Sequence, residues 1–592
     1  MLFKKRTSIS TPEKDTNSTA FSTVSSISDH IPTPVEDVNP LSYSFGPFSV
    51  VILILQGLVG TGIFATPGTI LKLMGSVGST YVLWITCFFI PLFSSYLYIE
   101  FAGYFPKRNG GDVAYLEAAY PRPKFLVPTV YAAISVVLSF TTSSALAFGR
   151  YVLLAADAEV TTWHYRGIAI GALTFACIII ALNTNAALKL QNLLGIIKVL
   201  FMLFICVLGW VILAGGTRVQ DPKASFRNMW EGTTTDGNNI TKSIINVVFS
   251  YGGYRYAFGV VAEFVGGKTK DGSPVDEELH HRKLMKTYGI YVPVSLFVIF
   301  ILYILMITSY YASAPPEEIK NSGMSVASLL FENAFNNKHA TTFLDVMVAF
   351  SAFGHLLTAI ISHSRGLREC GRQGVLPFPK FWTSTKPFNT PLGPIFITWL
   401  VNFIMIIAPP AGVAYQFIVD MGSYSGYIFT LCAICGLLTV RRDRRLKGLG
   451  NKGHYLPLPA IIILLLFEIM VIVMAFIPPK EGLKGSNGQI FYATYPIVTI
   501  GLIILCVIYY FVWRYTLPNL GGYVHREVIY RGENGEIGNT IVKVKLDDLE
   551  QWDKEHSTDD NGVGIVEELG SISSSSLQRD TVFVEKNSVE SK

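Results

Sequence analysis

The sequence predicts an all-α polytopic membrane protein with twelve transmembrane helices. Half of its 592 residues are hydrophobic and only 15% are charged, whereas a soluble protein carries about 25% charged residues. The mean hydropathy is +0.42. Apolar runs recur along the chain, each long enough to cross a hydrocarbon core about 30 Å thick. These observations argue against a soluble enzyme.

Twelve spans are expected, in two inverted repeats of five followed by two C-terminal helices. The first repeat covers residues 47–214, the second covers 243–440, and the last two spans lie within 456–515. The expected spans lie near residues 47–74, 79–104, 125–155, 165–184, 190–214, 243–265, 287–311, 341–363, 391–409, 413–440, 456–477 and 491–515.

Two tails flank these spans. Residues 1–46 are rich in Ser and Thr and contain no signal-like apolar run, so we expect a disordered N-terminal tail. Residues 516–592 form the C-terminal tail, and its part from 541 onward, with the run SISSSS, is expected to be disordered as well.

The distribution of Lys and Arg predicts the orientation. The loops after the second, fourth, sixth, eighth and tenth spans hold 21 Lys and Arg residues, whereas the loops on the opposite side hold 8. Loops rich in Lys and Arg stay in the cytoplasm. Both termini are therefore expected to be cytoplasmic. The net charge of +5 then reflects topology and requires no nucleic-acid partner. Asn239, in an outer loop, begins a weak N-glycosylation signal.

The sequence offers little sign of covalent chemistry. None of the seven cysteines lies in an outer loop. Cys432 and Cys435 have a redox spacing, but inside an apolar span they are expected to pack helices as small residues. We find no Walker-type loop for ATP and no metal-ligand cluster on a span. The chain is therefore expected to be neither an enzyme nor a primary pump, and to need no cofactor or metal.

The first span is interrupted by glycine. Gly57, Gly60 and Gly62 fall within six residues, and Pro67 follows. Glycine in a helix interior costs about 1 kcal/mol relative to alanine. The segment therefore indicates either close packing through small residues or an unwound stretch whose free backbone groups bind a polar ligand.

The sixth span favours the unwound stretch. It contains the pair Gly252-Gly253 near its middle, five spans after the first break. Corresponding breaks in two halves of a chain indicate an inverted-repeat secondary transporter with a site near the membrane midplane. Amides at the start of a half-helix favour a carboxylate, and freed carbonyls accept from an ammonium. The predicted ligand is an α-amino acid.

Several motifs resemble a known family. GLVGTGIF and FSYGGYRYAFGVVAEF are similar to the first-span and sixth-span motifs of the amino acid–polyamine–organocation superfamily. FPKRNGGDVAYLEAAYPRPK and SRGLRECGRQGVLPFPKFWTSTKPFNTP resemble its loops after the second and eighth spans. ADAEVTTWHYRG, LQNLLGIIK, FRNMWEGT, GRQGVLPF and KPFNTP resemble the fungal methionine permeases of the L-type amino acid transporter group.

The resemblance implies specific site residues. Backbone groups of the first span would bind substrate at Leu58, Gly60, Thr61 and Gly62. Carbonyls of the sixth span would meet the ammonium at Phe249, Ser250 and Gly252. The Phe249 ring would close over the substrate from outside, with ordinary packing as the alternative.

The chain departs from the methionine-permease pattern at the pocket. Those permeases lack the Gly252-Gly253 pair and tend to carry Asn in place of His355. Methionine is therefore a lead for the substrate and not a conclusion.

Two charged residues lie within predicted spans. Because a charge inside the membrane is costly, each is expected to have a function. Lys198 stands where sodium-coupled relatives of the family bind sodium. Its role is either proton coupling or bracing of the first and eighth spans. Arg255 either faces the substrate side chain or pairs with Glu263, Glu100 or Asp420.

Further ionisable residues lie at the predicted pocket and inner gate. His355 is a packing residue, a pocket residue or a proton relay. Glu263 would anchor the inner gate, where Arg365 and Arg372 form ion pairs or, alternatively, a solvated charge run.

We therefore expect a plasma-membrane permease that takes up neutral, sulfur-containing L-amino acids, methionine or cysteine among them, by alternating access. It would be sodium-independent and proton-coupled. An amino-acid sensor and an exchanger remain alternatives. No cysteine stands in residues 156–164, which argues against a disulfide-linked heavy-chain partner. By analogy, Lys4, Lys5 and Lys14 in the N-terminal tail suggest removal by ubiquitination.

Overall fold

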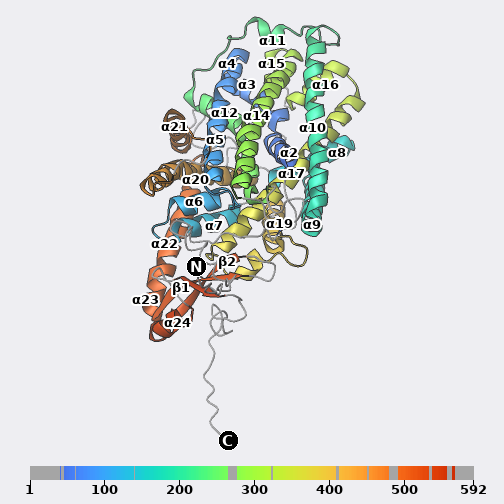
Figure 1. The fold of residues 1–592 in the computed structure, drawn as a ribbon. Coiled ribbons are helices and arrows are strands. Elements are labelled where there is room, and N and C mark those ends of the chain that lie inside the picture. The colour runs from blue at the N-terminus through green and yellow to red at the C-terminus, as the bar shows by residue number, and fades with distance from the viewer. Residues whose placement is uncertain are drawn as a thin grey trace, which may run out of the picture.

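The computed structural model is a bundle of long helices with a small sheet at one end (Figure 1). It describes residues 41, 46–60, 62–138, 141–264, 277–321, 325–407, 413–449, 453–478, 491–531, 537–556 and 563–566.

Helices stand at each of the twelve predicted spans. The first half consists of α2 Pro47–Leu58, α3 Gly62–Met74, α4 Val77–Cys87, α5 Phe89–Tyr104, α6 Asp112–Ala119, α7 Leu126–Leu138, α8 Thr142–Ala155, α9 Thr162–Leu182, α10 Thr184–Leu213 and α11 Ala224–Arg227. The second half consists of α12 Gly237–Ser250, η1 Gly252–Tyr254, α13 Arg255–Phe258, η2 Val261–Glu263, α14 Glu277–Ala312, α15 Pro316–Asn321, α16 Val326–Phe335, α17 Lys338–Arg372, α18 Pro379–Thr383, α19 Leu392–Ile407 and α20 Val413–Leu446.

The C-terminal part adds two further helices of the bundle and a small folded unit. These elements are α21 Leu458–Met474, α22 Thr494–Phe511, η3 Val512–Thr516, α23 Leu517–Gly521, β1 Tyr523–Arg531, β2 Ile537–Lys545, η4 Leu546–Asp548, α24 Leu549–Glu555 and β3 Val563–Val566.

The helices have the length and surface that a bilayer requires. Eight described helical segments are long and apolar enough to span it, and α2, α19 and α21 are shorter apolar helices within predicted spans. The outer face of α10 exposes large apolar side chains such as Leu193, Leu200 and Trp210. Such a face is stable in contact with lipid and would be costly in water. The chain is therefore an all-α polytopic membrane protein, as the sequence predicts.

The C-terminal segment corrects one prediction. Strands β2, β1 and β3 form a sheet in that order, with β1 antiparallel to β2 and parallel to β3. The expectation of disorder from residue 541 onward is wrong for the end of β2, for η4, for α24 and for β3. Val528, Val542 and Val544 form its core, with Trp552 packed against them. Val528 comes from β1, and alternation along β2, a period-2 signal, supplies Val542 and Val544.

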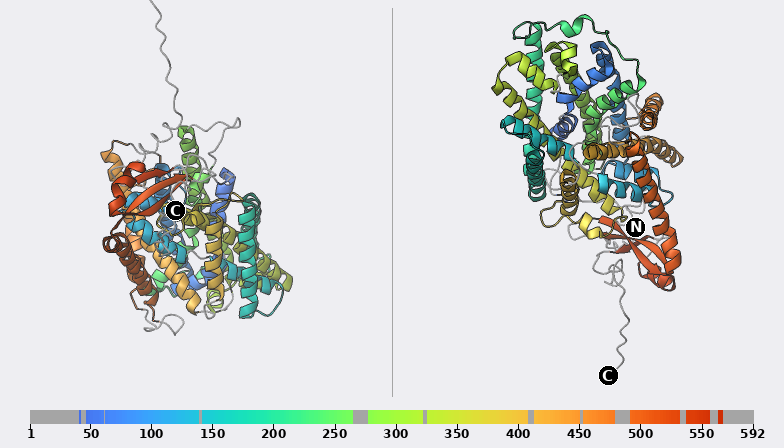
Figure 2. Two further views of the ribbon diagram at one scale, coloured as in Figure 1. Left: turned by 90° about the horizontal axis from the view of Figure 1, so that it is seen from below. Right: turned by 180° about the vertical axis from the view of Figure 1, so that it is seen from behind.

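The sheet is docked against the helical bundle, at the end opposite α11, α15 and α16 (Figures 1 and 2). Arg372 Nε at the end of α17 donates to the Ile537 carbonyl at 2.7 Å. Thr383 Oγ1 and the Tyr530 hydroxyl share a hydrogen bond of 2.8 Å. The folded part of the tail therefore packs on the loops that the charge pattern assigns to the cytoplasm.

Candidate functional site

The two glycine-rich breaks face each other. Helix α2 ends at Leu58 and α3 begins at Gly62, while α12 ends at Ser250 and continues as the short η1 and α13. A Cβ atom on Gly57 would lie 2.5 Å from the Gly253 carbonyl oxygen, and one on Gly253 would lie 1.9 Å from the Gly57 carbonyl. Only glycine at both positions allows this approach of two backbones.

One tyrosine of α14 joins the two breaks. The Tyr303 hydroxyl lies 3.0 Å from the Leu58 carbonyl and 3.3 Å from the Ser250 carbonyl, close enough to donate to either. The Leu58 carbonyl also accepts from the Gly60 amide at 3.3 Å. A carbonyl oxygen has two lone pairs, so the Ser250 carbonyl can still accept from a ligand beside Tyr303. Tyr303 therefore sets the spacing of two carbonyls that the sequence assigns to substrate binding.

Lys198 and Ser351 hold the remaining carbonyls of the first break. Lys198 Nζ donates to the Val59 carbonyl and, at 3.5 Å, to the Gln56 carbonyl. Ser351 Oγ lies 3.1 Å from the Gly60 carbonyl. These groups come from α10 and α17, so the break is braced from both sides. The first amides of α3 have no partner within their own helix.

The breaks line one cavity of about 380 Å³. Every described residue predicted to bind substrate is among its lining residues, namely Leu58, Gly60, Gly62, Phe249, Ser250, Gly252, Arg255 and His355. Thr61 lies outside the described residues. Phe249 is 62% exposed, so its ring is not packed over the cavity in this structure.

Arg255 has other neighbours than those expected. Its guanidinium lies 5.5 Å from the centre of the Tyr98 ring, and it interacts electrostatically with Asp112 and Glu468. Glu100 instead forms an ion pair with Arg441 at 2.6 Å. The expectation that Arg255 pairs with Glu100 is therefore wrong, because packing brings that carboxylate to a different helix.

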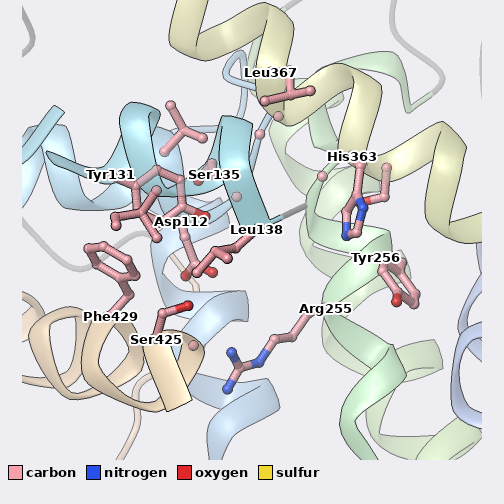
Figure 3. A pocket seen from close by; sticks show the side chains of 18 of the residues that line it. Asp112, Tyr131, Ser135, Leu138, Arg255, Tyr256, His363, Leu367, Ser425 and Phe429 are labelled. Atoms are coloured by element: carbon pink, nitrogen blue, oxygen red, sulfur yellow. The ribbon is translucent and has the colours of Figure 1, made fainter. Parts of the chain in front are cut away.

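Arg255 extends into a second cavity of about 310 Å³, toward Asp112 and Ser425 (Figure 3). Arg255, Tyr256 and His363 line both cavities. Because the loop residues before α6 also line the second cavity, it extends from the candidate site toward the predicted cytoplasmic side.

Two histidines of α17 flank Tyr256. The ring centre of His355 lies 5.7 Å from that of Tyr256, and the ring centre of His363 lies 5.9 Å from it. His355 Nδ1 and Ser144 Oγ share a hydrogen bond of 2.8 Å. A Cβ atom on Gly60 would lie 3.6 Å from the His355 ring. His355 is thus a hydrogen-bonded residue beside the first break.

An ionic network lies next to the second cavity, whose lining includes Gly110 and Gly366. Arg365 Nε is 3.4 Å from Glu263 Oε1, and Asn109 Nδ2 donates to the same carboxylate at 3.2 Å. Glu263 is therefore not a partner of Arg255 either. The pair joins η2 of the sixth span to α17, as an inner-gate contact would.

A second buried group of charges adjoins that pair. Arg108 contacts Glu117 at 2.7 Å and Glu369 at 2.5 Å, and Arg372 contacts Glu369 at 2.8 Å. Burial alone would lower the pKa of Arg108, but the carboxylates of Glu369 and Glu117 outweigh it and raise this pKa. The network joins the loop after the second span to the end of α17.

The remaining predictions concern the glycosylation signal and the lysines of the N-terminal tail. Asn239 lies in the first turn of α12, half-buried, and not in an irregular loop. The tail lysines Lys4, Lys5 and Lys14 lie outside the described residues.

Sequence reasoning missed several residues of the site, namely Tyr303, Ser351, Asp112, Tyr256, His363 and Glu468. Glu468 carried a detectable signal, since a carboxylate within a predicted span is costly. Tyr303 and Ser351 carried none, because polar side chains that bond to backbone are common in helices.

A membrane bundle with a central cavity between two interrupted helices defines the chain as a transporter and not an enzyme. Residues 45–511 match the family model described as "Amino acid permease". The chain therefore belongs to the amino acid permease family.

Proteins with similar sequences are named as permeases or transporters. The "High-affinity methionine permease" of Saccharomyces cerevisiae is 33% identical over 533 residues, covering 88% of this chain and 86% of the relative. The "Low-affinity methionine permease" of the same yeast is 26% identical, covering 82% and 85%. The human "Cystine/glutamate transporter" is 25% identical, covering 66% and 72%. The resemblance to fungal methionine permeases is confirmed.

Proposed function

We propose that this protein takes up neutral L-amino acids by alternating access, with methionine and then cysteine as the leading candidates. The observation that carries the proposal is the pairing of two broken helices around one cavity, joined by Tyr303. Amides at the start of α3 suit a carboxylate, and the Ser250 carbonyl of the sixth-span break suits an ammonium. The relatives named as methionine permeases support the choice of side chain.

The proposed transport is independent of sodium and driven by a proton gradient. The Lys198 ammonium donates to the Val59 and Gln56 carbonyls, which are oxygen ligands that a sodium ion would otherwise need. This geometry supports a role of Lys198 in bracing the first span and supports a sodium-free site, while Ser351 supplies the contact from the eighth span.

The proposed cycle uses the contacts at both ends of the cavity. Phe249 would fold over the bound substrate from outside, and the Glu263–Arg365 pair would open toward the cytoplasm. We place the protein in the plasma membrane with cytoplasmic termini, where ubiquitination of tail lysines would control its abundance.

Uptake of radiolabelled amino acids into cells that lack their own permeases tests the function. We expect methionine uptake that persists when choline replaces sodium and rises as the outer pH falls. Binding without uptake would instead establish a sensor. Uptake that requires an amino acid on the opposite side would establish an exchanger.

A further inference from the structure

A carboxylate on α21 faces the candidate site from outside the two predicted five-helix repeats. Glu468 lines the larger cavity together with Gly60, Gly62 and Ser250. The residue is 2% exposed. Its Oε2 atom is buried without a hydrogen-bond partner, and within the described part of the chain no cationic group approaches it within 4.0 Å.

The charges around Arg255 do not balance. One guanidinium interacts with two carboxylates, Asp112 and Glu468. Asp112 receives a hydrogen bond of 2.5 Å from the Tyr98 hydroxyl and stands in the first turn of α6, where the helix dipole favours a negative charge. Burial raises the pKa of Asp112 overall, although Arg255 and the Tyr98 hydroxyl partly offset this rise. Asp112 has stabilising partners that Glu468 lacks.

The other titratable groups near Glu468 offer it little compensation. Helix α21 packs against α20, α5 and α12. From α20, Tyr427 interacts with Glu468, and Asp420 lies near Tyr427. On α5, Glu100 pairs with Arg441. On α12, Lys242 is exposed. Arg255 is thus the nearest balancing charge, and it is shared with Asp112.

A buried carboxylate that lacks donors and a dedicated counter-ion is costly, and a proton removes its charge. We propose that Glu468 binds the co-transported proton, with Arg255 as the positioning residue that links it to the substrate site. This inference rests on the proposed proton-coupled uptake and names the group that performs the coupling.

The step requires only one proton and no other reactant. A proton from the outer solution forms an O–H bond on the Glu468 carboxylate, and the cluster of Arg255, Asp112 and Glu468 changes from one excess negative charge to neutral. After the site opens inward, the proton leaves through the second cavity, which Arg255 and Asp112 line. Each zwitterionic amino acid thereby crosses with one positive charge.

Purified full-length protein in proteoliposomes tests the assignment with radiolabelled methionine. An inside-alkaline gradient of one pH unit should support about tenfold accumulation by the unmodified protein for one proton per substrate. Glu468→Gln should lose this accumulation but keep counterflow, in which labelled substrate exchanges without a gradient. Glu468→Asp should keep both. Glu332→Gln, a change at an exposed residue of α16, serves as the control.

The outcomes separate the two proposals. If the unmodified protein catalyses counterflow but ignores the pH gradient, the proposed proton coupling fails, and the role of Glu468 fails with it. If the unmodified protein accumulates methionine and Glu468→Gln does so equally, only the role of Glu468 is overturned. That role is also overturned if Asp112→Asn abolishes coupling while Glu468→Gln retains it. If Glu468→Gln lacks counterflow, Glu468→Asp decides, and an unchanged pH dependence of its uptake would count against the proposal.

Discussion

At the scale of single residues, the site is built from backbone groups that side chains of other helices hold in place. Tyr303 contacts both breaks, Lys198 and Ser351 hold the carbonyls of the first, and Ser144 orients His355. Backbone recognition needs this support because an unwound segment has no hydrogen-bond ladder of its own. Mutations of supporting residues should therefore weaken substrate binding without any direct contact with the substrate side chain.

The Tyr303 hydroxyl offers the sharpest residue-scale prediction. Tyr303→Phe removes the donor shared by the Leu58 and Ser250 carbonyls, at a cost of about 0.5–1.5 kcal/mol for the hydrogen bond it makes. We expect a higher KM for uptake of several amino acids alike, because the backbone part common to all of them is affected. Saturation kinetics of uptake measure this change.

Tyr310 provides the matched control. It lies two turns further along the same helix, is buried, and its hydroxyl has no hydrogen-bond partner among the described residues. Tyr310→Phe should leave KM unchanged. Equal effects of the two substitutions would show that the Tyr303 hydroxyl does not organise the site.

At the scale of elements, the first and sixth spans cross through their glycines. The backbones of Gly57 and Gly253 approach so closely that neither position has room for a Cβ atom. The neighbouring Gly252 has open space around it. Both glycines line the cavity, but only Gly253 also makes the close contact between the two spans.

Alanine substitution should separate these tasks. Gly253→Ala places a Cβ atom against backbone that cannot rotate away, and such overpacking costs about 1–3 kcal/mol. We expect a clear loss of thermal stability in detergent, measured by size-exclusion chromatography after heating. Gly252→Ala should leave stability near that of the unmodified protein. A reversed order would contradict the crossing of the two spans at Gly57 and Gly253.

At the scale of the whole molecule, the ionic network at the end of α17 is in direct contact with the C-terminal sheet. Arg372 contacts Glu369 within the network and also donates to Ile537 at the start of β2. Lys124, in the loop after the second span, forms an ion pair of 2.5 Å with Glu527 of β1. The folded tail and the inner end of α17 are thus parts of one surface.

The orientation predicts a labelling pattern. Glu159→Cys adds a thiol at an exposed position after the third span, and Leu446→Cys adds one after the tenth, where Leu446 is 75% exposed. A membrane-impermeant maleimide should modify the first in intact cells and the second only after permeabilisation. The native cysteines are buried or half-buried, so the unmodified protein serves as background. The opposite pattern would invert the topology.

The sequence by itself determined the membrane class, the helix at each predicted span and the positions of the two breaks. Those properties depend on local composition, since apolar run length and glycine act within a few residues of chain. It also indicated eight of the residues that line the cavity, because they stand in or beside the breaks or on a span that faces them.

The side chains that support the site could be identified only from the packing of helices that are distant in the sequence. Tyr303 lies 245 residues from Leu58, and Ser351 lies 291 residues from Gly60. Arg255 interacts with Asp112 and Glu468, and Glu100 pairs elsewhere. Such pairings depend on how distant helices pack, and hydropathy carries no information about the partner of a polar group. The folded tail was missed for a related reason, because its short strands become stable only when they pair and dock.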